Sequence, residues 1–367
     1  MLLRARENCM KKYCVIGLMS GTSLDGVDIA CCYFSNNDEG WTFEIGDATT
    51  VEYTGEWHQK ISTLHKKSAE VFAKTHVEFG QLLGSLTKEF IQRLRLQVDF
   101  VSSHGHTIFH QPNNQFTFQI GEGAALSAAS GLPVVCDFRS KDVALGGQGA
   151  PLVPIGDELL FSKYNYCLNL GGIANISFNQ ITERIAFDVT PCNMVLNQLS
   201  SALGMKYDDG GQVSKKGKVN ELLLKQLNEC GFYSSGPAGP KSLGREDVER
   251  DFFSIIHSHD MTLEDKLRTF SEHIAVQISS VVNHSGKERN ERKKLLITGG
   301  GAFNTFLVQR IASLSQADVI IPDKKIIEYK EALIFAFLGV LRWRGEVNCL
   351  KSVTGSVTDH VGGAIYM

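Results

Sequence analysis

The sequence lacks long hydrophobic runs and a strong excess of either charge. No stretch approaches the roughly 18 uninterrupted apolar residues of a membrane-spanning helix, and residues 1–7 lack the apolar core of a signal peptide. The 367 residues carry a net charge of -3, so no large basic surface for nucleic acid is indicated. We therefore expect a cytoplasmic protein that binds neither membranes nor nucleic acid.

Disulfide and metal-binding cysteine patterns are also missing. None of the nine cysteines forms a C-x-x-C pair, and the neighbours Cys31 and Cys32 would face opposite sides of a strand. This pattern indicates reduced thiols that mostly act as small buried side chains. A P-loop is excluded as well, because the nearest glycine–lysine match, in residues 211–218, has the wrong spacing and no hydroxyl residue after the lysine.

The order of apolar segments predicts a duplicated α/β architecture. Strands are expected at residues 13–18, 27–34, 43–54, 98–102, 132–136, 165–170, 185–187, 294–297 and 319–321. Helices are expected at residues 68–96, 123–130, 194–203, 220–228, 263–283, 303–313 and 330–343, with a mobile loop at 210–218. Each half reads as a β-meander followed by helix and strand, unlike a Rossmann unit.

A chain of this length suits two domains. We place the first at residues 1–160 and the second at 161–343, with residues 344–367 packing back on the first. Because glycine turns follow strands in both halves, a ligand is expected in a cleft between the domains.

Glycine is plentiful, at 35 residues against 8 prolines, and one cluster joins the first two apolar runs. This turn consists of Gly21, Thr22, Ser23, Leu24, Asp25, Gly26, Val27 and Asp28. Amides and hydroxyls in such a turn can bind phosphate, while Asp25 and Asp28 would hold Mg²⁺. Taken alone, the segment is equally consistent with a β-hairpin turn that binds nothing.

Two further glycine turns follow strands in the second half. They contribute Gly171, Gly172 and Asn175, and then Gly299, Gly300, Gly301 and Asn304. Glycine allows the backbone to approach a ligand closely. The order of the three turns predicts one phosphate-binding turn in each half and a flat binding surface for a nucleoside.

Three histidines, His104, His106 and His110, follow the strand predicted at 98–102. Residues two apart on a strand share a face, so zinc binding is one interpretation. Hydrogen bonding of His104 to a sugar or phosphate is the second interpretation, and simple packing is the third. No H-E-x-x-H motif or Cys–His cluster accompanies them.

Several stretches together resemble the anhydro-N-acetylmuramic acid kinases, a bacterial branch of the actin/hexokinase/Hsp70 superfamily. They occur in family order at residues 17–28, 103–105, 119–123, 137–139, 142, 146–154, 169–175, 241–246, 298–304, 331–332 and 352–355. The combination of Gly-Gly-Gln-Gly-Ala-Pro with the N-terminal loop is highly specific. The resemblance implies a two-domain actin/hexokinase/Hsp70-like fold of duplicated ribonuclease H-like type, with ATP and Mg²⁺ as cofactors.

The family opens the 1,6-anhydro bridge of anhydro-N-acetylmuramic acid with water and phosphorylates the freed O6 from ATP. The resemblance assigns the general base to Asp188. It also assigns sugar contacts to His104, Glu331 and the loop of Gln148, Gly149, Ala150 and Pro151, and it suggests a homodimer. Other readings are a helix N-cap for Asp188, a helix-dipole role for Glu331 and an ion-pair network of Asp137, Arg139 and Asp142.

The chain departs from the family directly after Asp188. Thr190 and Cys192 stand where the family has glycines, and Asn197 stands where it commonly has an acidic residue. Two alternatives therefore accompany the kinase prediction: a kinase for another amino or anhydro sugar, and a catalytically weak nucleotide-binding regulator. A metal hydrolase built on the three histidines is a more distant alternative.

Overall fold

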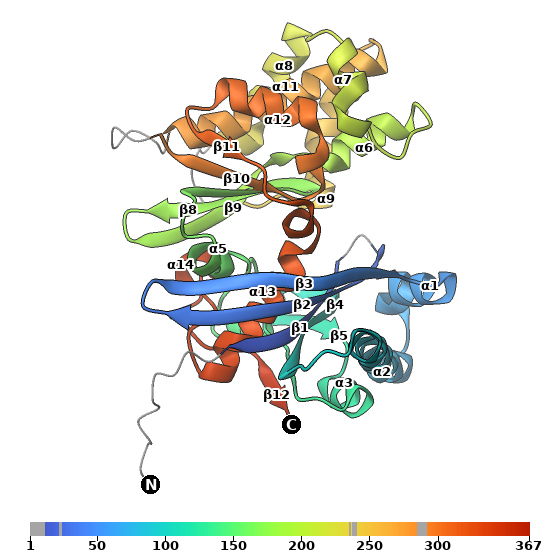
Figure 1. Ribbon diagram of the computed structural model, residues 1–367. Helices are drawn as coiled ribbons and strands as arrows, with labels where there is room; N and C mark the ends of the chain where they lie inside the picture. Colours follow the sequence, from blue (N-terminus) through green and yellow to red (C-terminus); the bar gives the residue numbers. More distant parts are fainter. Residues whose placement is uncertain (1–11, 22–23, 235, 237–240, 285–291) are drawn as a thin grey trace. The chain divides into compact units, whose positions relative to one another are not determined.

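The chain forms two compact units in a computed structural model that describes residues 12–21, 24–234, 236, 241–284 and 292–367 (Figure 1). One unit comprises Met1–Leu160 and Tyr329–Met367, and the other comprises Phe161–Glu328. Residues 329–343, expected in the second domain, therefore belong to the first unit. The change of unit coincides with a break inside helix α13 (Lys324–Arg344), where Tyr329 has non-helical φ and ψ of -117° and 15°.

The first unit contains a mixed sheet with the strand order β12-β6-β4-β1-β2-β3, in which β5 also pairs with β4. Its strands are β1 (Tyr13–Ser20), β2 (Gly26–Asn37), β3 (Gly40–Glu52), β4 (Phe100–Gln111), β5 (Phe116–Ile120), β6 (Val134–Cys136) and β12 (Ala364–Tyr366). Its helices are α1 (Gly55–Thr63), α2 (Ala69–Leu94), α3 (Gly123–Ser130), α4 (Ser140–Ala144), α5 (Pro154–Leu160) and α14 (Lys351–Thr354), with most of α13.

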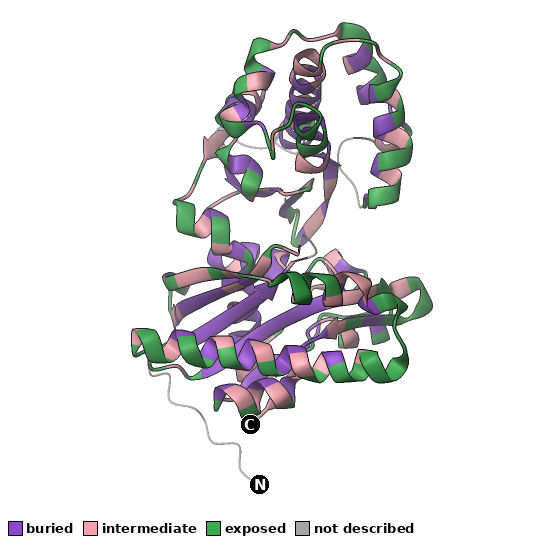
Figure 2. Ribbon diagram, turned by 90° about the vertical axis from the view of Figure 1, so that its right-hand side faces the viewer, coloured by how far each residue is buried: buried purple, intermediate pink, exposed green. Residues whose placement is uncertain are grey.

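Alternation along β1 gives this sheet two buried faces. Ile16 and Leu18 join the core that includes residues of α1 and α2, whereas Gly17 contacts α13 on the opposite face. Figure 2 shows the buried residues concentrated in the strands and on the inner faces of the helices. The sheet of the first unit is thus a central layer with packed side chains on both faces.

The second unit contains a sheet with the order β11-β10-β7-β8-β9. Its strands are β7 (Tyr166–Leu170), β8 (Ile173–Gln180), β9 (Glu183–Pro191), β10 (Lys294–Thr298) and β11 (Asp318–Ile320). Its helices include α6 (Asn193–Ser201), α7 (Gln212–Lys216), α8 (Glu221–Asn228), α9 (Arg245–Asp247), α10 (Ser254–His257), α11 (Leu263–His284) and α12 (Thr305–Leu314). The long helix α11 supplies buried residues such as Phe270 and Ile274 to the core of this unit.

Both sheets have the same connectivity. In each, the first strand pairs antiparallel with the second, and the second with the third. The first strand then pairs parallel with a fourth, which pairs parallel with a fifth. This repeated order is the duplicated ribonuclease H-like arrangement, and it confirms the predicted fold class.

Three local predictions were wrong. The strand expected to end at residue 102 continues through His104 and His106, because β5 pairs with its second half. The turn expected after Gly172 is strand β8 from Ile173, so Asn175 lies in a strand. The loop expected at 210–218 contains α7, whose first turn is capped by the Asp208 carboxylate through the Val213 and Ser214 amides, both at 2.8 Å.

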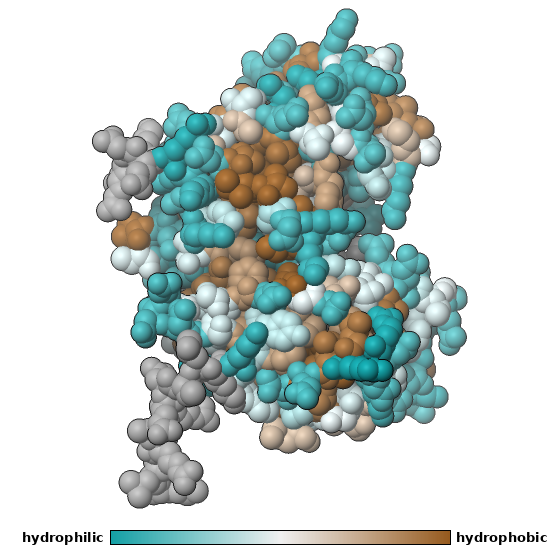
Figure 3. Space-filling view, viewed as in Figure 1, coloured by the Kyte–Doolittle hydropathy of each residue, from teal (hydrophilic) through white to brown (hydrophobic). Residues whose placement is uncertain are grey.

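The visible surfaces of both units are largely hydrophilic, with hydrophobic groups interspersed among them (Figure 3). Within the described residues, none of the helices combines the length and apolar character that crossing a membrane requires.

Packing of α13 on β1 leads to a stability prediction. A methyl group on Gly17 would overlap the Ala332 carbonyl, which cannot rotate away. We expect Gly17→Ala to lower the free energy of unfolding by about 1–3 kcal/mol, the usual cost of overpacking. Urea unfolding measures this change. Gly55→Ala is the matched control, because that position has open space; equal stability of the two variants would contradict the packing described here.

Candidate functional site

The turn between β1 and β2 presents carboxylates at the end of the first unit's sheet. Asp28 pairs with Met19 across the strands, and its Oδ1 accepts a hydrogen bond of 2.6 Å from Thr50 Oγ1. Leu24 adopts a left-handed φ of 59°, and its amide donates to the Gly21 carbonyl at 3.3 Å. Asp25 is exposed, and Gly21, Gly26 and Asp28 are half-buried, whereas Thr22 and Ser23 lie outside the described residues.

Glu331 is electrostatically linked to this turn. Glu331 lies at the start of the α13 segment that packs on the first unit, and its surface is partly exposed and partly covered by the surrounding protein. Desolvation by the surrounding protein raises the pKa of its carboxyl; the Arg139 cation lowers this pKa, and the Asp28 anion raises it further. Glu331, Asp28 and Arg139 therefore form one charged group in the first unit.

His104 and Arg139 connect this group to the glycine-rich loop. The buried His104 Nε2 accepts hydrogen bonds from Arg139 Nε at 3.0 Å and Nη2 at 2.9 Å. Burial and the adjacent guanidinium keep the pKa of His104 well below its usual value, so the imidazole is neutral. Arg139 Nη1 also donates to the Gly149 carbonyl at 2.7 Å. The pair fixes the backbone next to the predicted sugar-binding loop.

A buried carboxylate holds the other side of that loop. Asp142, which is fully buried, accepts from the Gly149 amide at 2.7 Å and leaves no room for a side chain at Gly147. The Gln148 amide donates to the Thr354 carbonyl at 2.8 Å, while the Gln148 side chain is exposed. Ala150 and Pro151 follow, joined by a cis peptide bond. The hydrogen bonds to Arg139, Asp142 and Thr354 hold the backbone of this loop in place and leave Gln148 exposed.

The histidines of β4 do not converge on a metal. His106 Nδ1 pairs with Ser20 Oγ at 2.8 Å, and burial lowers the pKa of His106 to about 4. His110 Nδ1 pairs with Thr117 Oγ1 at 3.1 Å. A left-handed φ of 70° at Gly105 interrupts the regular alternation of the strand. Across the residues that the structure describes, the metal-binding pattern suggested by this spacing is absent.

In the second unit, two of the predicted glycine turns lie against each other. β7 and β10 are parallel neighbours, and Asn169 pairs with Thr298 immediately before both turns. Gly299, with a φ of 79°, and Gly301 have no room for a side chain, because Asn169 and Leu170 occupy that space. Asn193 Nδ2 donates to the Leu170 carbonyl at 2.9 Å and ties the start of α6 to the same place.

The remaining predicted nucleotide-binding residues have mixed roles. Gly172 and Asn175 are exposed. Nothing crowds Gly300 closer than 3.8 Å, so its backbone is accessible. Asn304 instead caps α12, because its Oδ1 accepts from the Leu307 amide at 3.0 Å.

Asp188 lies near the end of β9, where it pairs with Asn175 across the strands. Its half-buried carboxylate accepts hydrogen bonds from the Leu243 amide at 2.9 Å and from Ser242 Oγ at 3.4 Å. Burial raises the pKa of Asp188, and these two hydrogen bonds partly oppose the rise. Asp188 does not cap α6, whose first residue is Asn193.

The segment that holds Asp188 is itself anchored by aromatic rings. The Asp188 amide donates to the Lys241 carbonyl at 2.9 Å. Lys241 Nζ lies 5.0 Å from the centre of the Phe232 ring and 5.3 Å from that of Tyr233, and burial lowers the pKa of this amine. A cavity of about 580 Å³, lined partly by Ser242 and Leu243, adjoins this segment and has the size of a small-molecule site.

Thr190 and Cys192, the two departures from the family pattern, are fully buried. Thr190 Oγ1 accepts a hydrogen bond of 2.9 Å from the Tyr233 hydroxyl and lies 3.3 Å from His273 Nε2. His273 Nδ1 in turn contacts Asn228 Oδ1 at 2.7 Å, and burial lowers the pKa of His273 to about 3. The sequence did not predict this network, because its hydrogen-bonded partners are 40 or more residues apart.

The repeated sheet order and the two compact units define the class of protein: an α/β chain of two units, each with the ribonuclease H-like strand order. The model of the anhydro-N-acetylmuramic acid kinase family matches residues 13–367. The chain therefore belongs to that family.

Individual family members support this assignment over nearly the whole chain. The chain is 33% identical over 382 residues to the anhydro-N-acetylmuramic acid kinase of Caldanaerobacter subterraneus subsp. tengcongensis, with 96% of each protein covered. It is 35% identical over 369 residues to the Pasteurella multocida kinase, again with 96% coverage of each. It is 32% identical over 401 residues to the Haemophilus influenzae kinase, covering 97% of this chain and 98% of that one.

The Thr190 network leads to a prediction about stability. Thr190→Val keeps the shape but removes the hydroxyl, which leaves the buried Tyr233 hydroxyl and His273 with one partner fewer. We expect a loss of about 1–3 kcal/mol in the free energy of unfolding, measured with denaturant. Thr190→Ser retains the hydroxyl and serves as control. If the valine and serine variants had the same free energy of unfolding, the hydrogen bonds of Thr190 would not be what stabilises this position.

Proposed function

We propose that this chain uses ATP and water to convert 1,6-anhydro-N-acetylmuramic acid into N-acetylmuramic acid 6-phosphate, a step in the recycling of cell-wall sugars. The observation that carries the proposal is the Asp188 carboxylate near the end of β9, held by Leu243 and raised in pKa by burial. Membership in a family of kinases for this sugar supports the substrate.

Asp188 has the properties of a general base. Its raised pKa makes it a better proton acceptor than an ordinary aspartate, yet the Leu243 amide keeps the carboxylate in one orientation. In the proposed reaction Asp188 removes a proton from water as the water oxygen bonds to C1 of the sugar. The C1–O6 bond breaks, and O6 attacks the γ-phosphorus of ATP and displaces ADP.

ATP is the phosphate donor in this proposal. Exposed backbone at Gly172 and the uncrowded Gly300 would contact the nucleotide in the second unit. Mg²⁺ fits the donor set of the first unit, because it binds one or two carboxylates together with phosphate oxygens. Asp25 and Asp28 would hold it, where it would neutralise charge on the transferring phosphoryl group.

Sugar recognition would come from the glycine-rich loop and the charged group of the first unit. Gln148 is exposed for hydrogen bonding, and the backbone of Gly149 is fixed by Arg139 and Asp142. Neutral His104 and Glu331 complete this set of residues. We place the reaction in the cytoplasm, where ATP is available, and propose that the chain works as a homodimer, as the family resemblance suggests.

Thr190 and Cys192, where the chain departs from the family pattern, are buried, and this favours the family's sugar as the substrate over another sugar. Thr190 and Cys192 have no exposed surface, so their side chains fill the interior of the second unit instead of narrowing a ligand site. Thr190 also secures the strand end that carries Asp188, through Tyr233 and His273. The altered sequence therefore supports an active enzyme more than a weak nucleotide-binding regulator.

An assay with purified protein tests the proposal. With ATP, Mg²⁺ and the anhydro sugar, we expect equimolar ADP and sugar 6-phosphate, measured by mass spectrometry. Asp188→Asn should lower the rate by about 10²–10⁴-fold, because an amide cannot accept the proton. Asp247→Asn, which alters a carboxylate elsewhere in the same cavity lining, is the control. ATP binding without any sugar product would contradict the proposal.

The pH dependence of the rate provides a separate prediction. A base must be deprotonated, so kcat/KM should fall as the pH drops through the raised pKa of Asp188. Ser242→Ala removes a hydrogen bond that lowers this pKa, and we expect the acidic limb to move to higher pH by less than about one unit. Ser254→Ala is the control, because the Ser254 hydroxyl donates a hydrogen bond to the Arg250 carbonyl of the same helical segment. An unmoved limb in Ser242→Ala would argue against Asp188 as the base.

A further inference from the structure

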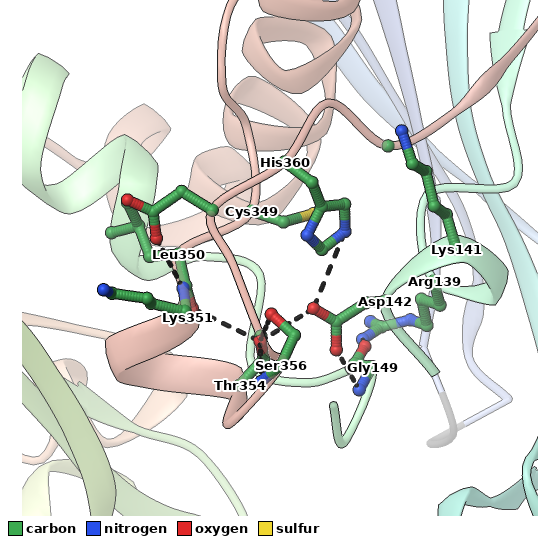
Figure 4. Close-up of polar contacts among 12 residues, drawn as sticks. Arg139, Lys141, Asp142, Gly149, Cys349, Leu350, Lys351, Thr354, Ser356 and His360 are labelled. Atoms are coloured by element: carbon green, nitrogen blue, oxygen red, sulfur yellow. Dashed lines mark hydrogen bonds and ion pairs between the residues drawn. The ribbon is translucent and has the colours of Figure 1, made fainter. Parts of the chain in front are cut away.

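Three side chains of different chemistry converge inside the first unit, next to the predicted sugar-binding loop at Gly149 (Figure 4). They are Asp142 of α4, Cys349, which follows α13, and His360, which precedes β12. A carboxylate oxygen, Sγ and a ring nitrogen lie within 4.8 Å of one another, and all three residues are buried. Among the residues that the structure describes, this is the only group of three or more His, Cys, Asp or Glu side chains with the spacing of a metal site.

The backbone holds two of these residues in register. Cys349 and His360 form an antiparallel bridge in which each amide donates to the other carbonyl at 3.1 Å. Side chains of directly opposed residues in such a pair project from the same face. Cys349 Sγ and the His360 ring are therefore brought together by main-chain hydrogen bonds, before any ion binds.

The hydrogen bonding of His360 determines where its lone pair points. His360 Nδ1 lies 3.2 Å from the Thr358 carbonyl, which can only accept, so Nδ1 carries the proton. In the neutral ring Nε2 then has a lone pair, and it makes no hydrogen bond within the described structure although His360 is only 6% exposed. Imidazoles that bind metals commonly show this arrangement, with the distal nitrogen donating to a backbone carbonyl.

Asp142 faces this lone pair. Asp142 Oδ1 lies 3.7 Å from His360 Nε2, which is too long for a hydrogen bond. The same oxygen accepts from Thr354 Oγ1 at 2.7 Å, and Oδ2 accepts from the Gly149 amide. These bonds orient the carboxylate, and Oδ1 keeps a lone pair that the Thr354 hydrogen bond does not use. Two electron-pair donors that face each other in a buried space are what a cation would stabilise.

We propose that Asp142 Oδ1, Cys349 Sγ and His360 Nε2 bind a structural Zn²⁺ ion. Carboxylate, thiolate and imidazole are all zinc ligands, and tetrahedral zinc places ligand atoms about 3.3–3.8 Å apart. The 3.7 Å between Asp142 Oδ1 and His360 Nε2 lies in this range, and all three ligand atoms lie within 4.8 Å of one another. The charges also balance, because Zn²⁺ would neutralise the carboxylate and a thiolate. A small oxygen ligand, such as water, would complete the coordination.

The thiol would lose its proton to solvent when zinc binds. Burial and the Asp142 charge raise the pKa of Cys349 to about 12, so this thiol stays protonated until a cation replaces the proton. An ion pair of protonated His360 with Asp142 is the competing interpretation. It would require a hydrogen bond where 3.7 Å separates the atoms, and it would leave the Cys349 thiol only its 4.0 Å contact with the Phe138 carbonyl.

Zinc at this position would tie the C-terminal segment to the sugar-binding loop. Asp142 holds the Gly149 amide, while Cys349 and His360 flank the segment that contains Thr354, which accepts from Gln148. The ion would stabilise the conformation of this loop through Asp142 and would take no part in the chemical reaction. Its effect should therefore appear in stability and metal content.

Metal content and cobalt spectroscopy of the full chain test the proposal. Metal-free protein should take up one Zn²⁺ per chain, and Zn²⁺ should raise its melting temperature further when excess Mg²⁺ is already present. Co²⁺ should produce a thiolate-to-cobalt charge-transfer band that added Zn²⁺ removes. Cys349→Ser should abolish the band, and His360→Gln should weaken zinc binding by at least about 100-fold.

Cys136→Ser is the matched control, because Cys136 is a buried thiol of the same unit whose pKa is also raised to about 12. It should keep the cobalt band and the zinc affinity of the parent chain. A parent chain that gives no thiolate–cobalt band would overturn the proposal, and this readout does not depend on whether any variant folds. Equal zinc binding by the Cys349→Ser, His360→Gln double variant would overturn it as well.

Discussion

Desolvation of the Asp188 carboxylate is the physical interaction on which the proposed chemistry depends. The interior raises the pKa of this group, which increases its basicity, whereas the hydrogen bonds from Leu243 and Ser242 keep it ionised and oriented. Neither effect would suffice alone. A more exposed aspartate would be a weaker base, and a buried one without hydrogen bonds would hold its proton. The aromatic rings around Lys241 fix the segment that supplies these bonds.

The duplicated sheet topology explains why the functional groups lie near strand ends in both units. In each sheet the second strand runs antiparallel between the first and third, and the fourth and fifth add in parallel. Asp28 follows the tight turn after β1, and the glycine turns of the second unit follow the parallel neighbours β7 and β10. Buried strands make the scaffold rigid, while backbone exposed at the turns remains accessible to a ligand.

Much of the fold could be predicted from the sequence, because the strands and helices carry clear apolar periodicity. The long helix α2 and strands β1, β2 and β3 occur close to where the pattern places them. Strand β5 and the extension of β4 were missed because their pairing depends on residues distant from the apolar run. The break at Tyr329 was missed for a similar reason, since the residues around it are all compatible with a helix.

The candidate site was predictable only where a motif marked it. Asp188 and the glycine turns follow from local sequence, but the partners of Asp188 come from a segment about 55 residues away. The same limit applies to the Asp142, Cys349 and His360 cluster, in which 218 positions separate the first and last residues. Close contact between such residues depends on tertiary packing, which spacing along the chain does not reveal.

The destination of the water oxygen tests the central claim most directly. Reaction in ¹⁸O-water, followed at once by NMR of the sugar and phosphate products, shows which bond the water forms. The proposed mechanism predicts the label on C1 of the sugar 6-phosphate and none on phosphorus. Label in inorganic phosphate, with an unlabelled sugar, would contradict it, because water would then attack ATP instead of the anhydro bridge.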